Sequence, residues 1–264
     1  MNFIKTLKQT LLLTTIIVSI TNCHYKPKQQ INKWQPLFNG KDLNDWIVKI
    51  KGYPLGENYN NTFIVEDGVM KVNYKVYDSF NNAFGHIYYK TPFSNYKFRM
   101  QYRFTGEQLQ GGAGWAKRNS GVMIHCEDPK NIGIDQDFPV SIEVQLLGGL
   151  DAGERPTGNL CTPGTHVVID NSLYTPHCIN SSSQTYNGDQ WVTVEIEVRN
   201  DSIIKHFING EKVLSYTKPQ IGGAVDYNKN YWNALKNTPL KKGYISLQSE
   251  SHPVEFKNIE LLEL

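Results

Sequence analysis

The 264-residue sequence has little of what marks proteins that span a membrane, bind nucleic acid or hold zinc. Its apolar run from Leu11 to Ile20 is too short to cross a bilayer. Lysine and arginine exceed aspartate and glutamate by only 27 to 25, and no basic cluster follows the N-terminal segment, so we expect no nucleic-acid partner. The four cysteines form no CxxC pair and no zinc-type spacing with histidine, and no HExxH motif occurs.

The N-terminal segment has the features of an export signal. Residues 1–8 carry two lysines and no acid, and the apolar run that follows has the proportions of a signal-peptide core. This run ends at Ile20-Thr21-Asn22-Cys23, a loose match to the site where lipoprotein signal peptidase cleaves and the cysteine is acylated. We therefore predict a lipoprotein signal peptide over residues 1–22, lipidation of Cys23, and a tether over residues 23–33. The protein would be exported and lipid-anchored in the periplasm or outer membrane, with the anchor as its only membrane contact. A simple secreted protein is the alternative.

Three cysteines remain after Cys23, which allows one disulfide and one free thiol. Cys161 and Cys178 bracket a loop with turn-forming prolines, and such a loop gains stability from a covalent closure. Cys126 ends a strand-like pattern and is expected to be buried. We predict a Cys161–Cys178 disulfide.

Strand patterns dominate the rest of the chain and predict one large all-β domain, a β-sandwich or jelly roll. Asn209-Gly210 joins two alternating runs and is a strong type I′ hairpin signal. A helix of two turns is expected only over residues 230–236. The expected strands are residues 63–65, 69–72, 96–104, 191–198, 203–208, 211–216, 244–248 and 255–264. Aromatic residues make up 12% of the chain, which suits a carbohydrate-handling surface but also occurs in other extracellular sandwiches.

A polar row on the strand pattern at residues 141–147 is the main candidate for a site. Ser141, Glu143 and Gln145 share one face of the expected strand, and apolar residues alternate with them on the other. This arrangement favours a ligand groove on one side and a core on the other, although a half-exposed strand would show it too. Glu195 and Glu197 also alternate with an apolar face, and we interpret them as a solvated convex surface rather than a catalytic pair.

Several motifs resemble those of the 3-keto-disaccharide hydrolase domain family. The stretch from Trp34 to Trp46 is similar to its opening signature LFNGKDLxxW. Further matches follow in the same order: Asn119-Ser120-Gly121-Val122, Glu143-Val144-Gln145, Trp191, Asn209-Gly210 and Glu255-Phe256-Lys257-Asn258-Ile259. The resemblance covers nearly all of residues 34–264, which we take as the domain. It implies a concanavalin A-like jelly-roll β-sandwich of two antiparallel sheets, with the groove on the concave sheet, and action on glycosides oxidised at C3.

The resemblance also bears on the chemistry. Related family-sixteen glycoside hydrolases carry three acids in an E-x-D-x-x-E pattern on the same strand, whereas this chain has Glu143, Gln145 and Gly148. Hydrolysis by two carboxylates needs a second acid, which Glu250 could supply from elsewhere. A 3-keto sugar offers another route, because the ketone acidifies the C2 proton: one base removes it, the C1 substituent leaves and water adds to the enone.

Candidate residues follow from that route. Glu143 and His125 are the candidate bases, and a divalent metal held by Glu143 or a histidine could polarise the ketone. The candidate substrate-binding residues are Gln145, Arg118, Asn119, His166, Gln248 and Glu250. Each histidine could equally be an ordinary hydrogen-bonded residue, and Arg118 could simply pair with an acid. The alternatives to cleavage of 3-keto-glycosides are a non-catalytic carbohydrate-binding lipoprotein and a conventional glycoside hydrolase.

Overall fold

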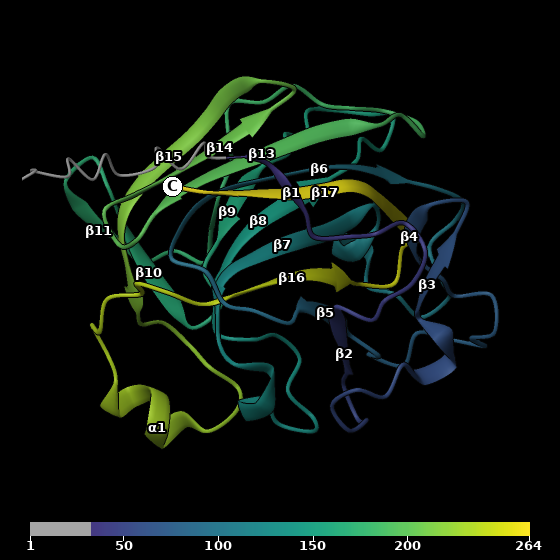
Figure 1. Cartoon of the computed structure of the whole chain (residues 1–264), viewed down its shortest axis with the longest axis horizontal. Coiled ribbons are helices and arrows are strands. Elements are labelled where there is room, and N and C mark those ends of the chain that lie inside the picture. The colour runs from purple at the N-terminus through teal and green to yellow at the C-terminus, as the bar shows by residue number, and fades with distance from the viewer. Residues whose placement is uncertain (1–32) are drawn as a thin grey trace, which may run out of the picture. The chain divides into compact units, whose positions relative to one another are not determined.

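The computed structural model describes residues 33–264 as two stacked antiparallel sheets (Figure 1). Residues 1–32 lie outside the described residues, and so do the predicted signal peptide, Cys23 and nearly all of the tether. No helix within residues 33–264 is both long and apolar enough to cross a bilayer. The fold is the predicted all-β jelly-roll sandwich.

The larger sheet has ten strands. One of them, β1 (Gln35–Pro36), pairs among the described strands only with β17 (Val254–Glu263). In spatial order its other strands are β11 (Ser172–Tyr174), β10 (Thr165–Ile169), β15 (Glu211–Ile221), β14 (Ile203–Ile208), β13 (Val192–Arg199), β6 (Asn95–Phe104), β17 (Val254–Glu263), β4 (Val69–Val72) and β3 (Phe63–Glu66).

The smaller sheet has seven strands and carries the candidate site. Their order is β12 (Cys178–Ile179), β9 (Asn159–Cys161), β8 (Ile142–Leu147), β7 (Asn119–Cys126), β16 (Tyr244–Ser249), β5 (Gly85–Tyr89) and β2 (Trp46–Ile50). One α-helix, α1 (Lys229–Ala234), and three 3₁₀ turns, η1 (Tyr59–Asn61), η2 (Gly114–Ala116) and η3 (Pro129–Asn131), complete the described elements.

The hydrophobic core lies between the two sheets and explains the alternating patterns. Ile142, Val144 and Leu146 of β8 are fully buried in the same cluster as Val194 and Ile196 of β13. Burying each such side chain contributes about 1.5–3 kcal/mol relative to leaving it exposed. A one-residue slip of β8 would place Glu143 in this apolar layer, so the core fixes the register of the strand that carries the candidate site.

The predicted hairpins form with the turn chemistry that the sequence indicates. Asn209 and Gly210, between β14 and β15, have φ values of 49° and 86°. Asp67 and Gly68, between β3 and β4, have φ values of 54° and 76°. Asparagine, aspartate and glycine tolerate these left-handed conformations best, which is why these dipeptides close the hairpins.

The predicted disulfide joins β9 to β12 at the edge of the smaller sheet. Cys161 and Cys178 are direct cross-strand neighbours, with Cα atoms 4.1 Å apart. Cys126, at the end of β7, is a buried free thiol, as expected. The bond holds the short edge strand β12 against the sheet.

Removing this disulfide is expected to destabilise the protein. The bond closes a loop with a sequence separation of 17, and the chain-entropy relation gives a loss of about 3 kcal/mol in the free energy of unfolding for a loop of that length. Urea denaturation of a Cys161→Ala/Cys178→Ala variant measures the loss. A reductant should lower the wild-type midpoint towards that of the variant and leave the variant unchanged. A wild-type midpoint that does not move after complete reduction would contradict the prediction.

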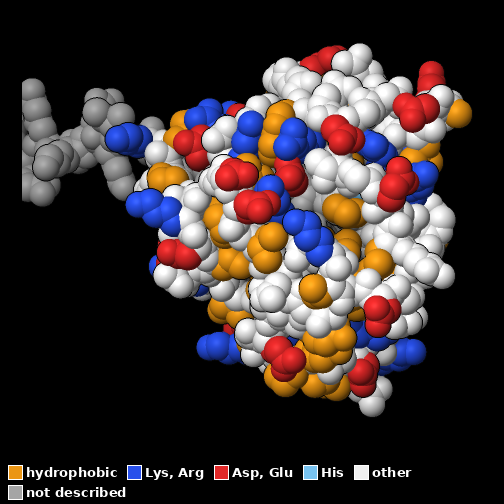
Figure 2. Space-filling view, turned by 90° about the vertical axis from the view of Figure 1, so that its right-hand side faces the viewer, with side chains coloured by type: hydrophobic (Ala, Val, Ile, Leu, Met, Phe, Trp, Pro, Cys, Tyr) orange, Lys and Arg blue, Asp and Glu red, His pale blue; other side chains and the backbone are white. Residues whose placement is uncertain are grey.

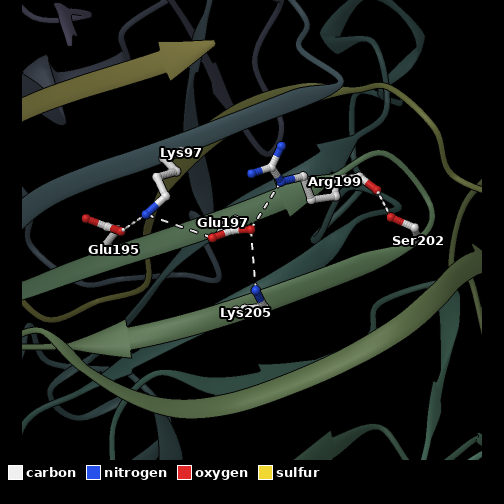
Figure 3. A network of polar contacts seen from close by, with 6 residues as sticks. All are labelled: Lys97, Glu195, Glu197, Arg199, Ser202 and Lys205. Atoms are coloured by element: carbon white, nitrogen blue, oxygen red, sulfur yellow. Dashed lines mark hydrogen bonds and ion pairs between the residues drawn. The ribbon is translucent and has the colours of Figure 1, made fainter. Parts of the chain in front are cut away.

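The outward face of the larger sheet carries a ladder of ion pairs that involves Glu195 and Glu197 (Figure 3). Lys97 Nζ lies 3.0 Å from Glu195 Oε1, while Glu197 is bonded by Arg199 and Lys205. Partial burial alone would raise the pKa of Glu197, but the Arg199 and Lys205 contacts lower it overall. Both carboxyl groups therefore take part in ion pairs on a half-exposed face, which agrees with their interpretation as a surface feature.

Candidate active site

The main candidate site is a cavity of about 330 Å³ on the face of the smaller sheet that is turned away from the core. Glu143 and Gln145 point into it from β8, while the alternate residues of that strand lie in the core. Asn119, at the start of β7, and Glu250, directly after β16, add further polar groups to its lining. Because β7 lies between β8 and β16, the strand order brings these residues together from distant parts of the chain.

A glycine on the neighbouring strand makes room for the Glu143 carboxyl group. Gly121 of β7 pairs with Gln145, and a Cβ added at Gly121 would lie 2.7 Å from Glu143 Oε1. The side chain of Glu143 therefore extends across β7 in the direction of β16. Only 7% of Glu143 is exposed.

Glu143 and Glu250 form a buried carboxyl pair. Burial raises the pKa of Glu143 to about 8. Burial, and then the charge on Glu143, raise the pKa of Glu250 well above its usual value. Glu250 Oε2 is buried and has no hydrogen-bond partner among the described residues. Near neutral pH such a pair holds protons that exposed carboxyl groups would release, so one member can act as an acid while the other titrates as a base.

Amide groups around the pair add hydrogen-bonding capacity. Gln145 Oε1 accepts a hydrogen bond from Asn159 Nδ2 at 3.1 Å, which fixes the orientation of the Gln145 amide. Asn119 Oδ1 and both amide atoms of Gln248 are buried without partners among the described residues. Gln248 does not line the cavity, but it is the β16 residue opposite His86 on β5. Buried polar atoms without partners are uncommon in folded proteins, and they are available to a polar ligand.

Aromatic side chains form the wall of the cavity. Trp115, on η2, is 56% exposed and lines the cavity together with Phe138. Its ring lies nearly parallel to that of the buried Phe84, with an interplanar angle of 9° and centroids 6.2 Å apart. An exposed, flat ring beside carboxyl and amide groups suits the apolar face of a sugar.

Sequence reasoning missed Trp115 and Phe138, and also His177 and the disulfide as parts of the cavity lining. For Trp115 a signal exists in the sequence: a tryptophan in the glycine-rich stretch from Gly111 to Trp115 belongs to a loop rather than to the core. Phe138 and His177 have no such signal.

Besides Gln248, the structure places three more of the candidate residues away from this cavity. His125 lines a separate cavity, its Nε2 lies 3.0 Å from the carbonyl oxygen of Asn200, and burial lowers its pKa to about 4. His166 lies on β10 of the larger sheet. Arg118 donates hydrogen bonds to Gly188 and Asp189, as the alternative interpretation of this residue expected. The structure thus brings together Glu143, Glu250, Gln145 and Asn119 but not the other predicted residues.

One cluster of side chains at the edge of the cavity has the residue types of a metal site. Among residues 33–264, the one group of three or more potential ligands with converging atoms is Cys161, His177 and Cys178. The two sulfur atoms of this group are bonded to each other, so they cannot act as thiolate ligands. This group therefore does not supply the metal site that the sequence analysis left open at Glu143.

Comparison with known proteins agrees with the fold and identifies the family. Two solved structures from Parabacteroides distasonis ATCC 8503, described as candidate glycosyl hydrolases, each share 21% identity with the chain and cover 88% of it. The alignments cover 100% and 94% of those chains, with TM-scores of 0.51 and 0.52, and at this identity the likeness shows the fold alone. No curated protein matches the chain. The profile of the 3-keto-alpha-glucoside-1,2-lyase-like domain matches residues 33–262, so the chain belongs to this carbohydrate-active family.

Proposed function

We propose that the protein cleaves glycosides whose sugar ring carries a ketone at C3, by 1,2-elimination in the cavity around Glu143 and Glu250. The observation that carries this proposal is the buried carboxyl pair in one cavity, in which burial raises the pKa of Glu143 to about 8 and the pKa of Glu250 well above its usual value. Strongly shifted titratable groups that share a cavity are typical of acid–base catalysis. The 1,2-lyase-like family to which the chain belongs supports the same reaction class.

Each carboxyl group has a role in this reaction. The ionised Glu143 removes the C2 proton, which the neighbouring C3 ketone acidifies, and the released electron pair forms an enolate. The protonated Glu250 donates a hydrogen bond to the enolate oxygen, as a carboxylic acid kept neutral by burial can. The enolate then re-forms the C3 ketone, the C1–C2 double bond forms as the C1–O bond breaks, and the leaving oxygen takes the proton that Glu143 removed from C2. Addition of water to the enone completes net hydrolysis.

Conventional hydrolysis is the second candidate, and one observation favours it. The β8 strand supplies a single acid, but Glu250 brings a second carboxyl group into the same cavity. Two carboxyl groups are what the ordinary hydrolytic route requires. A site that only binds sugar does not need carboxyl groups with shifted pKa values, and burying two of them costs free energy at any pH at which they ionise.

A matched pair of substrates is expected to separate these candidates. We expect nitrophenol release from a nitrophenyl 3-keto-glucoside and none from its unoxidised parent, because only the ketone makes the C2 proton removable. In heavy water, deuterium should appear at C2 of the sugar, since hydration of the enone adds a solvent proton there. Retention of the original C2 proton through turnover would exclude elimination, and release from both substrates would support ordinary hydrolysis. The same assays with and without a chelator test whether turnover needs a divalent metal: loss of turnover that a divalent ion restores would show that it does.

The predicted export of the protein is part of the same proposal. The Cys161–Cys178 disulfide suits an oxidising compartment such as the periplasm. A lipid on Cys23 would hold the domain near a membrane surface, where it would meet glycosides that enter the cell envelope.

A further inference from the structure

A second cavity lies beside the cavity that Glu143 and Glu250 line (the carboxyl cavity). It measures about 400 Å³ and is bordered by the residues that follow β2, by the segment that precedes β5 and by Asp135. Lys51, Tyr53, Tyr59, Asn81 and Asn82 are among its lining residues. Figure 2 shows the end of the molecule formed by β3, β4 and the adjoining loops, where hydrophobic side chains are exposed between charged ones.

One buried ring, that of Phe84, lies between the two cavities. Phe84 packs against Phe80, which lines the second cavity, and against Phe138, which lines the carboxyl cavity, with centroid distances of 5.0 Å in both cases. On the same side, Lys51 of the second cavity forms an ion pair of 2.5 Å with Asp137, the neighbour of Phe138. The two cavities thus lie on either side of the Phe84 ring.

The second cavity combines aromatic rings with free amide groups. The rings of Tyr53 and Tyr59 stack with centroids 3.9 Å apart, and Tyr77 packs edge-on against Tyr59. Asn81 and Asn82 are exposed, with φ values of 45° and 56°, and their side chains make no hydrogen bond to other described residues. An amide offers both donors and an acceptor, which matches the hydroxyl groups of a sugar, while the rings match its C–H face.

The charges of the second cavity argue against an anionic ligand. The amine of Lys51 is paired with Asp137, so it is not free to bind an anion. Asp135 adds negative charge to the lining. A phosphate or carboxylate would therefore be repelled, whereas a neutral polyol would not.

We propose that this second cavity binds a further sugar unit of an oligosaccharide whose oxidised end occupies the carboxyl cavity. This inference rests on the proposed function for that neighbouring cavity. The bound unit would contribute affinity without touching the reacting atoms, so the second cavity would select longer glycosides over short ones. Its residues would determine specificity and take no part in the chemical step.

The test removes the two free amides without disturbing the backbone. Glycine adopts left-handed conformations without strain, so an Asn81→Gly/Asn82→Gly variant deletes only the side chains. Asn171→Gly, at an exposed left-handed position between β10 and β11, is the matched control. Calorimetry with unoxidised cellotetraose, maltotetraose and laminaritetraose, each beside its disaccharide, measures binding. For the tetrasaccharide that binds the wild type most tightly, we expect the double variant to be weaker by about fivefold to tenfold, the loss that one or two hydrogen bonds account for.

Turnover of the nitrophenyl 3-keto-glucoside should stay at the wild-type level in both variants, because this short substrate does not reach the second cavity. Equal tetrasaccharide affinity in the double variant and the wild type would overturn the proposal. So would tetrasaccharides that bind no better than disaccharides, or a double variant that loses turnover of the short substrate. A wild type that never cleaves the short substrate would instead refute the proposed function, while the binding comparison would still decide the role of the second cavity.

Discussion

Replacement of Glu143 by glutamine is expected to lower turnover of the 3-keto-glucoside by about 10²–10⁴-fold, the range that general acid–base catalysis typically contributes. Glutamine keeps the shape of the side chain and fits over Gly121 as the glutamate does, but it cannot accept the C2 proton. Substrate binding should therefore persist while the chemical step fails. Single-turnover kinetics and the Kd of an unreactive analogue measure the two effects separately.

A second glutamate replacement provides the control for this experiment. Glu195 also lies at the centre of a strand, but it faces outward on the larger sheet in an ion pair with Lys97. Glu195→Gln should keep wild-type turnover, because an exposed ion pair contributes little to stability and this one is remote from the cavity. Wild-type activity in Glu143→Gln would remove Glu143 as the base, and the search would then turn to Glu250.

The sequence was sufficient to predict the fold and the face on which Glu143 lies, and it offered Glu250 as a candidate second acid. Side chains alternate along β8, so Glu143 and Val144 point to opposite faces of the sheet. This alternation involves only neighbouring residues, so the sequence alone reveals it. The Asn209-Gly210 turn and the Cys161–Cys178 bond were predictable for similar reasons, since each rests on turn chemistry or on a small number of possible pairings.

The rest of the site depends on contacts between distant parts of the chain. The sequence alone offers Glu250 only as a candidate for the second acid. Its position beside Glu143 follows from the order of β8, β7 and β16 in the sheet, which no local pattern indicates. His125 lies on β7 like Asn119 and Gly121, yet the strand carries it beyond the cavity to a different one. A sequence pattern gives the face of a strand, but it does not give the position along the strand at which a cavity ends.

The carboxyl pair is also expected to make the folded protein less stable as the pH rises. Glu143 has a pKa of about 8 in the folded protein instead of 4.5, and burial and the charge on Glu143 raise the pKa of Glu250 well above its usual value. Below pH 4 both groups are protonated in the folded and unfolded states, so neither makes the free energy of unfolding depend on pH. Between pH 4.5 and 8 the unfolded chain releases these protons and the folded protein retains them. The free energy of unfolding therefore falls, by up to about 1.4 kcal/mol per pH unit for each group.

Glu143→Gln removes this cost, so the inactive variant should be more stable than the wild type at pH 8, by about 2–4 kcal/mol, and equally stable at pH 4. Urea denaturation at a series of pH values measures the difference. Glu197→Gln is the control of opposite sign, because the Arg199 and Lys205 contacts lower the pKa of Glu197 in the folded protein despite its partial burial. Its stabilising effect is present above the unfolded pKa, so this variant should gain nothing at pH 8. A Glu143→Gln variant that is no more stable than the wild type at pH 8 would show that the pair is solvated, and the base in the proposed mechanism would then lack its raised pKa. A gain in stability together with the loss of turnover would mean that the fold tolerates two buried acids because the reaction requires them.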